Sequence, residues 1–154
     1  MMKAKSGFTL VEILIVVVIL GILAAIVIPQ FTEASTEAKT SSLCTDLQTV
    51  RSQIELYKVQ HNDLLPGATA GVTFENALTT KTEISGAASD GDAKNGEYGP
   101  YLQKIPTNQF NGSNVVATGI AATVPIVSDG SAGWYFNTDT AAFNACDSAD
   151  HAKL

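Results

Sequence analysis

The fold is decided by the apolar stretch FTLVEILIVVVILGILAAIVI, which runs from Phe8 to Ile28 and contains one charged residue, Glu12. A helix of this length extends about 31 Å at roughly 1.5 Å per residue, which matches the hydrocarbon core of a bilayer. The rest of the 154-residue chain is rich in Thr, Ser, Ala, Asn and Gly. The sequence therefore predicts a polar domain attached to one apolar N-terminal helix.

Three kinds of segment have this composition: a cleaved secretory signal, a plain membrane anchor, and a more specialised helix. A secretory signal has a shorter apolar region followed by small residues at the cleavage site, whereas Ala24-Ala25 is followed by three further apolar residues. A plain anchor fits the length, and Lys3 and Lys5 before it predict a cytoplasmic N-terminus and an exported C-terminal part. An anchor does not explain Glu12, because a carboxylate inside a membrane helix is costly and usually functional.

The residues around Glu12 also form a motif. Residues 5–12 read KSGFTLVE, and this run resembles the class III signal of type IV prepilins and type II secretion pseudopilins. The resemblance combines a basic leader, Gly-Phe-Thr-Leu, a Glu at the right offset and a long apolar helix. It implies that a membrane peptidase cuts between Gly7 and Phe8 and methylates the new N-terminal Phe8. Glu12 then becomes the fifth mature residue.

Glu12 has a physical role in this interpretation. A buried carboxylate is tolerated when a cation pairs with it, and cleavage leaves a free amine on Phe8, about one helical turn away. In a stack of staggered subunits, Glu12 of one chain would meet the Phe8 amine of its neighbour and set the register. The alternative is that Glu12 lies near the membrane surface and extends to the headgroups.

Two residues weaken the apolar helix. Pro29, at its end, lacks an amide hydrogen and disfavours helix at the preceding residue, and Gly21 is a second weak point. The resemblance implies a partly unwound stretch between Gly21 and Pro29 that would let a filament extend. A simple kink at the membrane surface is the alternative.

Beyond Pro29 the sequence predicts helix to about Gln60, because neither Gly nor Pro occurs from residue 30 to 63. Apolar residues recur at spacings of 4, 3, 4 and 3, which is typical of a helix packed on one partner. These residues are Leu43, Leu47, Val50, Ile54 and Tyr57. On the other face Arg51 and Glu55 are spaced for an i,i+4 ion pair. His61 is predicted to be exposed at the helix end.

The C-terminal part predicts a small α+β head. A short helix is expected around residues 74–80, and strands at 115–118, 124–127, 133–137 and near 142–145, of which the last two form a hairpin. The predicted fold is therefore type IV pilin-like: a long kinked helix packed on a small antiparallel sheet. The expected divisions are a leader at 1–7, a membrane or filament-core helix at 8–28, an amphipathic half at 29–62 and a periplasmic head at 63–154.

The head contains a second, less specific resemblance. The runs GPYL…KIP.N.FNG and GWYF…T..F.A are similar to those of major, G-type pseudopilins. That likeness implies a calcium ion in the C-terminal loops, for which Asp129, Asp139, Asp147 and Asp150 supply candidate carboxylates. Residues 90–95 do not form an EF-hand, because Lys94 occupies a ligand position. No metal site and no cofactor is predicted from spacing.

The chain has two cysteines, Cys44 and Cys146. Export would place both in an oxidising compartment. A disulfide between them would attach the C-terminal tail to the helix across a loop of about 100 residues, and would stabilise the fold by roughly 4–5 kcal/mol. The alternative is two free, partly buried thiols.

Several function classes are disfavoured by the sequence. A net charge of −6 with no basic patch argues against nucleic-acid binding. No catalytic motif is present, and His61 and His151 are isolated. A monomeric, membrane-anchored binding protein using Trp134, Tyr135 and Phe136 would leave Gly7-Phe8 and Glu12 unexplained.

We therefore expect a filament subunit of type II secretion, anchored in the bacterial inner membrane before it joins a helical periplasmic pseudopilus. The expected partners are other copies of the chain, the prepilin peptidase and methylase, an inner-membrane assembly platform, minor pseudopilins and membrane lipid. The alternative is a major type IV pilin for adhesion, motility or DNA uptake.

Overall fold

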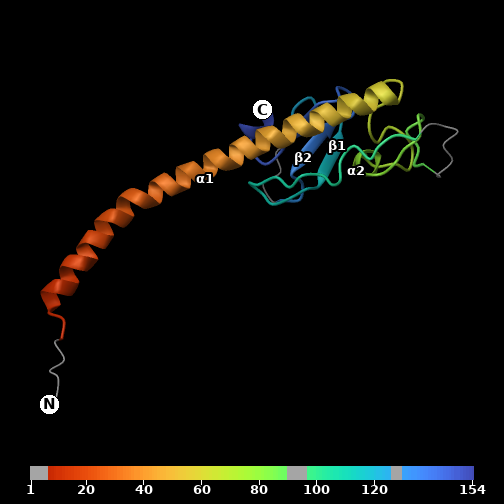
Figure 1. Ribbon diagram of the computed structural model, residues 1–154. Helices are drawn as coiled ribbons and strands as arrows, with labels where there is room; N and C mark the ends of the chain where they lie inside the picture. The colour runs from red at the N-terminus through yellow and green to blue at the C-terminus, as the bar shows by residue number, and fades with distance from the viewer. Residues whose placement is uncertain (1–6, 90–96, 126–129) are drawn as a thin grey trace, which may run out of the picture. The chain divides into compact units, whose positions relative to one another are not determined.

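The computed structural model describes residues 7–89, 97–125 and 130–154. Two compact units divide the chain, one up to Ala38 and one from Lys39 to Leu154. The elements in chain order are α1 (Leu10–Gln60), α2 (Phe74–Thr79), β1 (Val116–Gly119), β2 (Trp134–Asn137), β3 (Phe143–Ala145) and the 3-10 helix η2 (His151–Lys153) (Figure 1).

The first unit consists of the N-terminal part of α1. Its large apolar side chains between Phe8 and Phe31 are all exposed, from 42% for Val27 to 84% for Phe8. By length and composition α1 is capable of crossing a membrane. The predicted apolar helix is therefore present, and in the part of the chain that the structure describes its large apolar side chains have no covering partner.

Helix α1 continues through Gly21 and Pro29 without an interruption. Pro29 donates no amide hydrogen bond, and three residues later the Thr32 hydroxyl donates to the Ile28 carbonyl at 3.1 Å. The unwound stretch that the resemblance implies for a filament is absent from this single chain and stays a prediction for the assembled state.

In the second unit α1 is amphipathic, as predicted. Five residues of this part are at most 1% exposed: Leu43, Leu47, Val50, Ile54 and Tyr57. They pack with α2 and with one face of the sheet in a single core cluster. The spacing of 4, 3, 4 and 3 therefore identified the buried face of this helix correctly.

The sheet has three strands in the order β1-β2-β3. Strands β2 and β3 form the predicted antiparallel hairpin, with Trp134 opposite Ala145. Strand β1 is parallel to β2, with Val116 opposite Trp134, so the prediction of a wholly antiparallel sheet was wrong. A parallel pair needs a long crossover rather than a tight turn, and residues 120–133 provide it.

The strand predicted at 124–127 lies in this crossover. Val124 and Pro125 are not in a strand, and residues 126 and 127 lie outside the described residues. Elsewhere the predictions were close, since α2 falls within the expected 74–80 and β1 within one residue of the expected 115–118.

The two faces of the sheet have different partners. Side chains alternate along a strand, so Trp134 and Phe136 of β2 join the core beneath α1, whereas Tyr135 packs in a second cluster with Ala132 and Cys146. Figure 1 shows α1 lying along the strands in this unit.

Two sequence predictions about α1 were wrong. Arg51 does not pair with Glu55; its Nε donates to the Phe143 carbonyl at 2.9 Å and its Nη1 to the Leu154 carbonyl at 2.8 Å. Glu55 instead pairs with Lys58 at 3.1 Å. Strand β3 lies close enough to α1 for the Phe143 carbonyl to accept a hydrogen bond from the Arg51 guanidinium. The spacing of residues along the helix does not reveal this contact.

His61 is fully buried rather than exposed. Directly after it the chain turns through two residues in the left-handed region, Asn62 with φ 53° and Asp63 with φ 63°. Later segments then cover the helix end, and Thr82 bonds the His61 ring.

Candidate functional site

The sequence motif at the start of α1 forms a closed hydrogen-bond ring. The Glu12 carboxylate oxygen Oε2 accepts from both the Thr9 amide and the Thr9 hydroxyl, each at 2.7 Å. In return the Glu12 amide donates to Thr9 Oγ1 at 3.3 Å. Thr9 directly precedes Leu10, the first residue of α1, so this is a capping box with Thr9 as the N-cap.

The local sequence explains this geometry. The first amide groups of a helix have no partner within the helix, and the positive end of the helix dipole favours a carboxylate. Thr-x-x-Glu before an apolar run supplies both an acceptor and a carboxylate at the required spacing. The prediction from sequence identified Glu12 but missed Thr9, although the Thr9-x-x-Glu12 pattern would have revealed it.

The peptide bond between Gly7 and Phe8 lies outside α1, in chain without regular structure. Phe8 is 84% exposed, and no heavy atom lies within 4 Å of where a Cβ on Gly7 would be. Among the described residues, the bond predicted to be cleaved therefore lies outside any helix or strand, next to an exposed Phe8. The capping box also holds the Glu12 carboxylate beside the residue that would carry the new amine.

The cysteines do not form the predicted disulfide. Both are free thiols, Cys44 half-buried on α1 and Cys146 fully buried. The alternation of β3 explains this, because Ala145 faces the core beneath α1 while Cys146 lies in the cluster with Tyr135 on the opposite face. There the Cys146 thiol donates to the Ala132 carbonyl at 3.4 Å, and burial raises its pKa to about 11.

Of the acidic residues proposed for calcium, Asp147 and Asp150 have side-chain partners, whereas Asp139 is exposed and bonds Asn137 Oδ1 through its backbone amide at 2.9 Å. Asp147 accepts from Asn108 Nδ2 at 2.6 Å and contacts His151 Nδ1 at 2.5 Å. Asp150 pairs with Lys153 at 3.2 Å, and Asp129 lies outside the described residues. Within the described ranges, no three His, Cys, Asp or Glu residues are placed to hold a metal.

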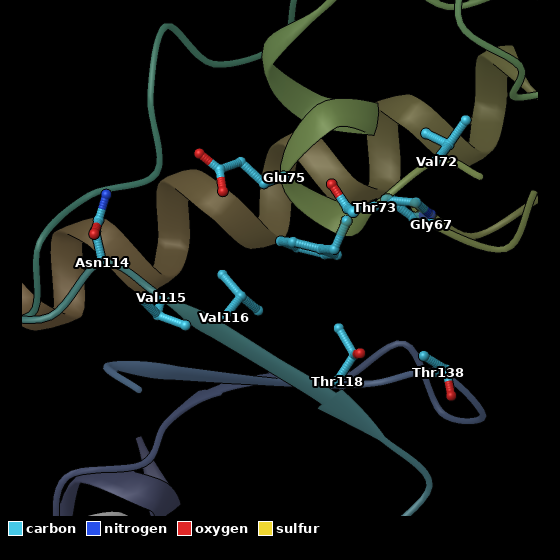
Figure 2. A pocket seen from close by; sticks show the side chains of 11 residues that line it. Gly67, Val72, Thr73, Glu75, Asn114, Val115, Val116, Thr118 and Thr138 are labelled. Atoms are coloured by element: carbon cyan, nitrogen blue, oxygen red, sulfur yellow. The ribbon is translucent and has the colours of Figure 1, made fainter. Parts of the chain in front are cut away.

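A groove of about 400 Å³ lies between the N-terminal end of α2 and strand β1, and Figure 2 shows the side chains that line it. Glu75 and Asn114 lie at one end of it, and Val116 and Thr118 of β1 line its floor. Its lining contains one carboxylate and neither His nor Cys, so it offers no catalytic constellation. The aromatic residues of β2 considered for recognition are all buried.

Comparison with known proteins gives consistent matches. Residues 2–28 match the family described as the prokaryotic N-terminal methylation motif. The chain is 34% identical to the type II secretion system core protein G of Pseudomonas aeruginosa over 108 residues, which is 70% of each chain. The chain belongs to the type II secretion core protein G family. The Vibrio cholerae core protein G is 29% identical over 133 residues, 86% of this chain and 84% of that relative.

The chain is also similar to a fimbrial protein. A fimbrial protein of Pseudomonas aeruginosa is 32% identical over 87 residues, 56% of each chain. The two core protein G matches cover 70% and 86% of this chain, against 56% for the fimbrial match. No solved structure gives a significant match.

Proposed function

We propose that this chain is the structural subunit of a helical pseudopilus in type II secretion and supports the export of folded proteins. The observation that carries the proposal is a helix whose large apolar side chains are exposed between Phe8 and Phe31, directly preceded by the Gly7-Phe8 bond. Membership of the core protein G family supports it.

The exposed apolar side chains need an apolar environment in which they are buried. A helix that is apolar on all sides belongs either in a membrane or in the interior of a larger assembly. This helix has both in succession: lipid surrounds it before assembly, and the helices of neighbouring subunits surround it afterwards. Transfer between two apolar environments leaves the hydrophobic free energy of these side chains nearly unchanged, so a polar contact has to drive recruitment.

Glu12 and Phe8 provide that polar contact. Cleavage after Gly7 converts the Phe8 amide nitrogen into an amine, which is then methylated and stays cationic. Before assembly the Glu12 carboxylate is held by Thr9 at 2.7 Å, which limits the cost of an anion near lipid. In the filament the carboxylate pairs with the Phe8 amine of a neighbour and fixes the axial register.

The direction of insertion follows from charge. Lys3 and Lys5 keep the N-terminus cytoplasmic by the positive-inside rule, so the head is exported to the periplasm. The proposed partners are the prepilin peptidase and methylase, an inner-membrane assembly platform, minor pseudopilins, membrane lipid and further copies of this chain. Nucleic acid is not among them.

The function needs no catalysis, and the related structural subunits are consistent with a role in assembly. Calcium in the C-terminal loops stays a proposal. The described carboxylates do not converge on one point, and both oxygens of Asp147 have protein partners. No step in the proposed function depends on the ion.

A type IV pilin is the alternative, favoured by the likeness to a fimbrial protein. Deletion of the gene in its native host separates the two. We expect secreted enzymes to accumulate inside the cell, with twitching motility and DNA uptake unchanged, and the wild-type gene to restore secretion. Normal secretion combined with loss of surface pili would contradict the pseudopilus and favour the pilin.

A further inference from the structure

His61, the residue after α1, lies in an aromatic cluster that the proposed function does not use. Its side chain is fully buried. Its ring stacks on that of Tyr57 with centroids 3.8 Å apart and planes inclined by 5°. Tyr98 meets it edge-on at 5.3 Å, and Tyr101 lies at 6.1 Å. Two segments distant in sequence, the end of α1 and residues 98–101, therefore meet at one imidazole.

Both ring nitrogens of His61 have a partner. Nδ1 lies 2.9 Å from the Tyr57 carbonyl, and Nε2 lies 2.9 Å from the Thr82 hydroxyl. Because a carbonyl only accepts, Nδ1 carries the hydrogen, and Nε2 of a neutral ring then accepts from Thr82. The neutral tautomer with hydrogen on Nδ1 satisfies both contacts.

Thr82 connects His61 to a later part of the chain. The Thr82 amide donates to the Tyr98 carbonyl at 2.9 Å, and the Tyr98 amide donates to the Thr82 carbonyl at 2.9 Å. We call this pair of bonds the Thr82–Tyr98 bridge. The bond from Thr82 to the imidazole ties this bridge to the end of α1. Tyr101 adds a second tie by donating to Gln60 Oε1 at 2.6 Å.

Within residues 7–89, 97–125 and 130–154, a protonated His61 would have no carboxylate as an ion-pair partner. The titratable side chains on the surrounding elements are Tyr57 and Lys58 of α1, Asp63 of the turn, Glu83 beside Thr82, and Tyr98 and Tyr101. No described carboxylate forms an ion pair with His61; Glu55 pairs with Lys58, and Glu97 pairs with Lys81. Burial lowers the pKa of His61, while backbone hydrogen bonds at Tyr57 and Glu83 oppose that effect.

We propose that His61 is an acid-sensitive latch, which holds the Thr82–Tyr98 bridge on the end of α1 while neutral and releases it when protonated. Protonation puts a hydrogen on Nε2, so the Thr82 hydroxyl must rotate from donor to acceptor, and it adds a buried charge to the closed state, which is the larger cost. The closed state therefore binds fewer protons than the open state. The latch is fully closed above the open-state pKa of about 6.5 and weakens as the pH falls below it.

Native-state hydrogen exchange tests the latch in the full-length chain held in detergent micelles. The opening constants at the Thr82 and Tyr98 amides are measured at pH 7.5 and 5.5 and corrected for the intrinsic exchange rates. An open-state pKa of about 6.5 predicts a rise of up to about tenfold at pH 5.5. A change smaller than twofold would overturn the proposal.

Two variants and an internal reference sharpen the test. His61→Gln keeps a polar side chain but cannot titrate, so the pH dependence should disappear, whereas His151→Gln should retain it. The Asn137 amide, which donates to Ala142 in the β2–β3 hairpin at 2.8 Å, should show little change. An equal rise at Asn137 would indicate global unfolding and contradict a local latch.

A readout in the wild-type chain covers the case in which His61→Gln fails to fold. Imidazole nitrogen shifts should show hydrogen on Nδ1 of His61 at pH 7.5, and a titration midpoint below about 6.5. A midpoint at or above that value, or hydrogen on Nε2 at neutral pH, would overturn the latch.

Discussion

The two halves of α1 differ in where their apolar side chains find a packing partner. From Leu10 to Ile28 the helix is apolar on all sides except at Glu12, and its large apolar side chains are at least 42% exposed. From Leu43 to Tyr57 the apolar residues form one stripe, and each is at most 1% exposed. The second half has its partner in its own chain, in α2 and the sheet. The first half requires a partner from outside, and the distribution of apolar residues around the helix distinguishes the two cases.

This difference predicts which substitutions affect the stability of the head and which affect assembly. Substitutions in the stripe should alter the free energy of unfolding of the head and leave the N-terminal half unaffected. Substitutions at the N-terminal motif should alter assembly and leave the head intact. Trp134 is the single tryptophan of the sequence and is fully buried in the core, so its fluorescence reports the head alone.

Glu12 gives the largest expected effect and separates charge from capping. Glu12→Gln keeps an acceptor for Thr9, because Gln also completes a capping box, but it removes the charge that would pair with an amine. We expect Glu12→Ala and Glu12→Gln to enter the membrane and be cleaved, yet to lower filament yield more than tenfold.

Filaments sheared from cells and quantified by immunoblot measure this yield, and the thermal transition of Trp134 fluorescence checks that the head is unchanged. If Glu12→Gln assembled like the wild type, charge pairing would be wrong and capping would account for Glu12.

Leu47 tests the stripe against the exposed half. Leu47 is 1% exposed in the core cluster, so Leu47→Ala should lower the free energy of unfolding by about 2–5 kcal/mol. Leu14 is 55% exposed, and Leu14→Ala should change the free energy of unfolding of the head by less than about 0.5 kcal/mol. Urea titrations in micelles measure both. Similar losses in the two variants would contradict the division of α1.

The reactivity of the Cys146 thiol tests whether it is buried on the face of the sheet away from α1. With its pKa raised to about 11 by burial and, to a smaller extent, by the charge of Asp147, about 0.1% of this thiol is ionised at pH 8. A thiol with an ordinary pKa near 8.5 is roughly a quarter ionised. Cys146 should therefore react with a thiol reagent at least 100-fold more slowly than an ordinary thiol.

Mass spectrometry of the chain isolated from the periplasmic side tests whether Cys44 and Cys146 are joined. We expect two free thiols. A Cys44–Cys146 cross-linked peptide would show that the predicted disulfide forms and that the description of Cys146 on the far face is wrong.

Thr9 gives the smallest expected effect. Thr9→Ala removes the hydroxyl that caps the Glu12 amide, and losses of this kind cost about 1 kcal/mol. Hydrogen exchange at the Glu12 amide in micelles should accelerate about fivefold, while Thr9→Ser should preserve protection. Unchanged exchange in Thr9→Ala would mean that the capping box does not hold in a membrane-like environment.

Much of the fold followed from local patterns in the sequence. The apolar run, the buried stripe from Leu43 to Tyr57, α2 and the β2–β3 hairpin all depend on residues close together in the chain. Periodicity and turn chemistry report such relations directly. Gly7, Phe8 and Glu12 were predicted in the same way, as one contiguous motif that lies within the matched residues 2–28, and their roles stay predictions.

Most of the wrong predictions involve contacts between distant segments. Arg51 bonds carbonyls of β3 and of Leu154, His61 is covered by Thr82 and Tyr98, and β1 is parallel to β2. Each depends on where a later segment lies, which helix spacing does not encode. The capping box is different, because its pattern was visible and Thr9 was missed.

The most direct test of the central claim is the N-terminal mass of chains recovered from sheared periplasmic filaments. The account predicts a chain that begins at Phe8, carries one methyl group on its amine and lacks residues 1–7. Assembled filaments whose subunits retain Met1, or begin anywhere other than Phe8, would contradict the claim that the N-terminal half of α1 is processed for assembly.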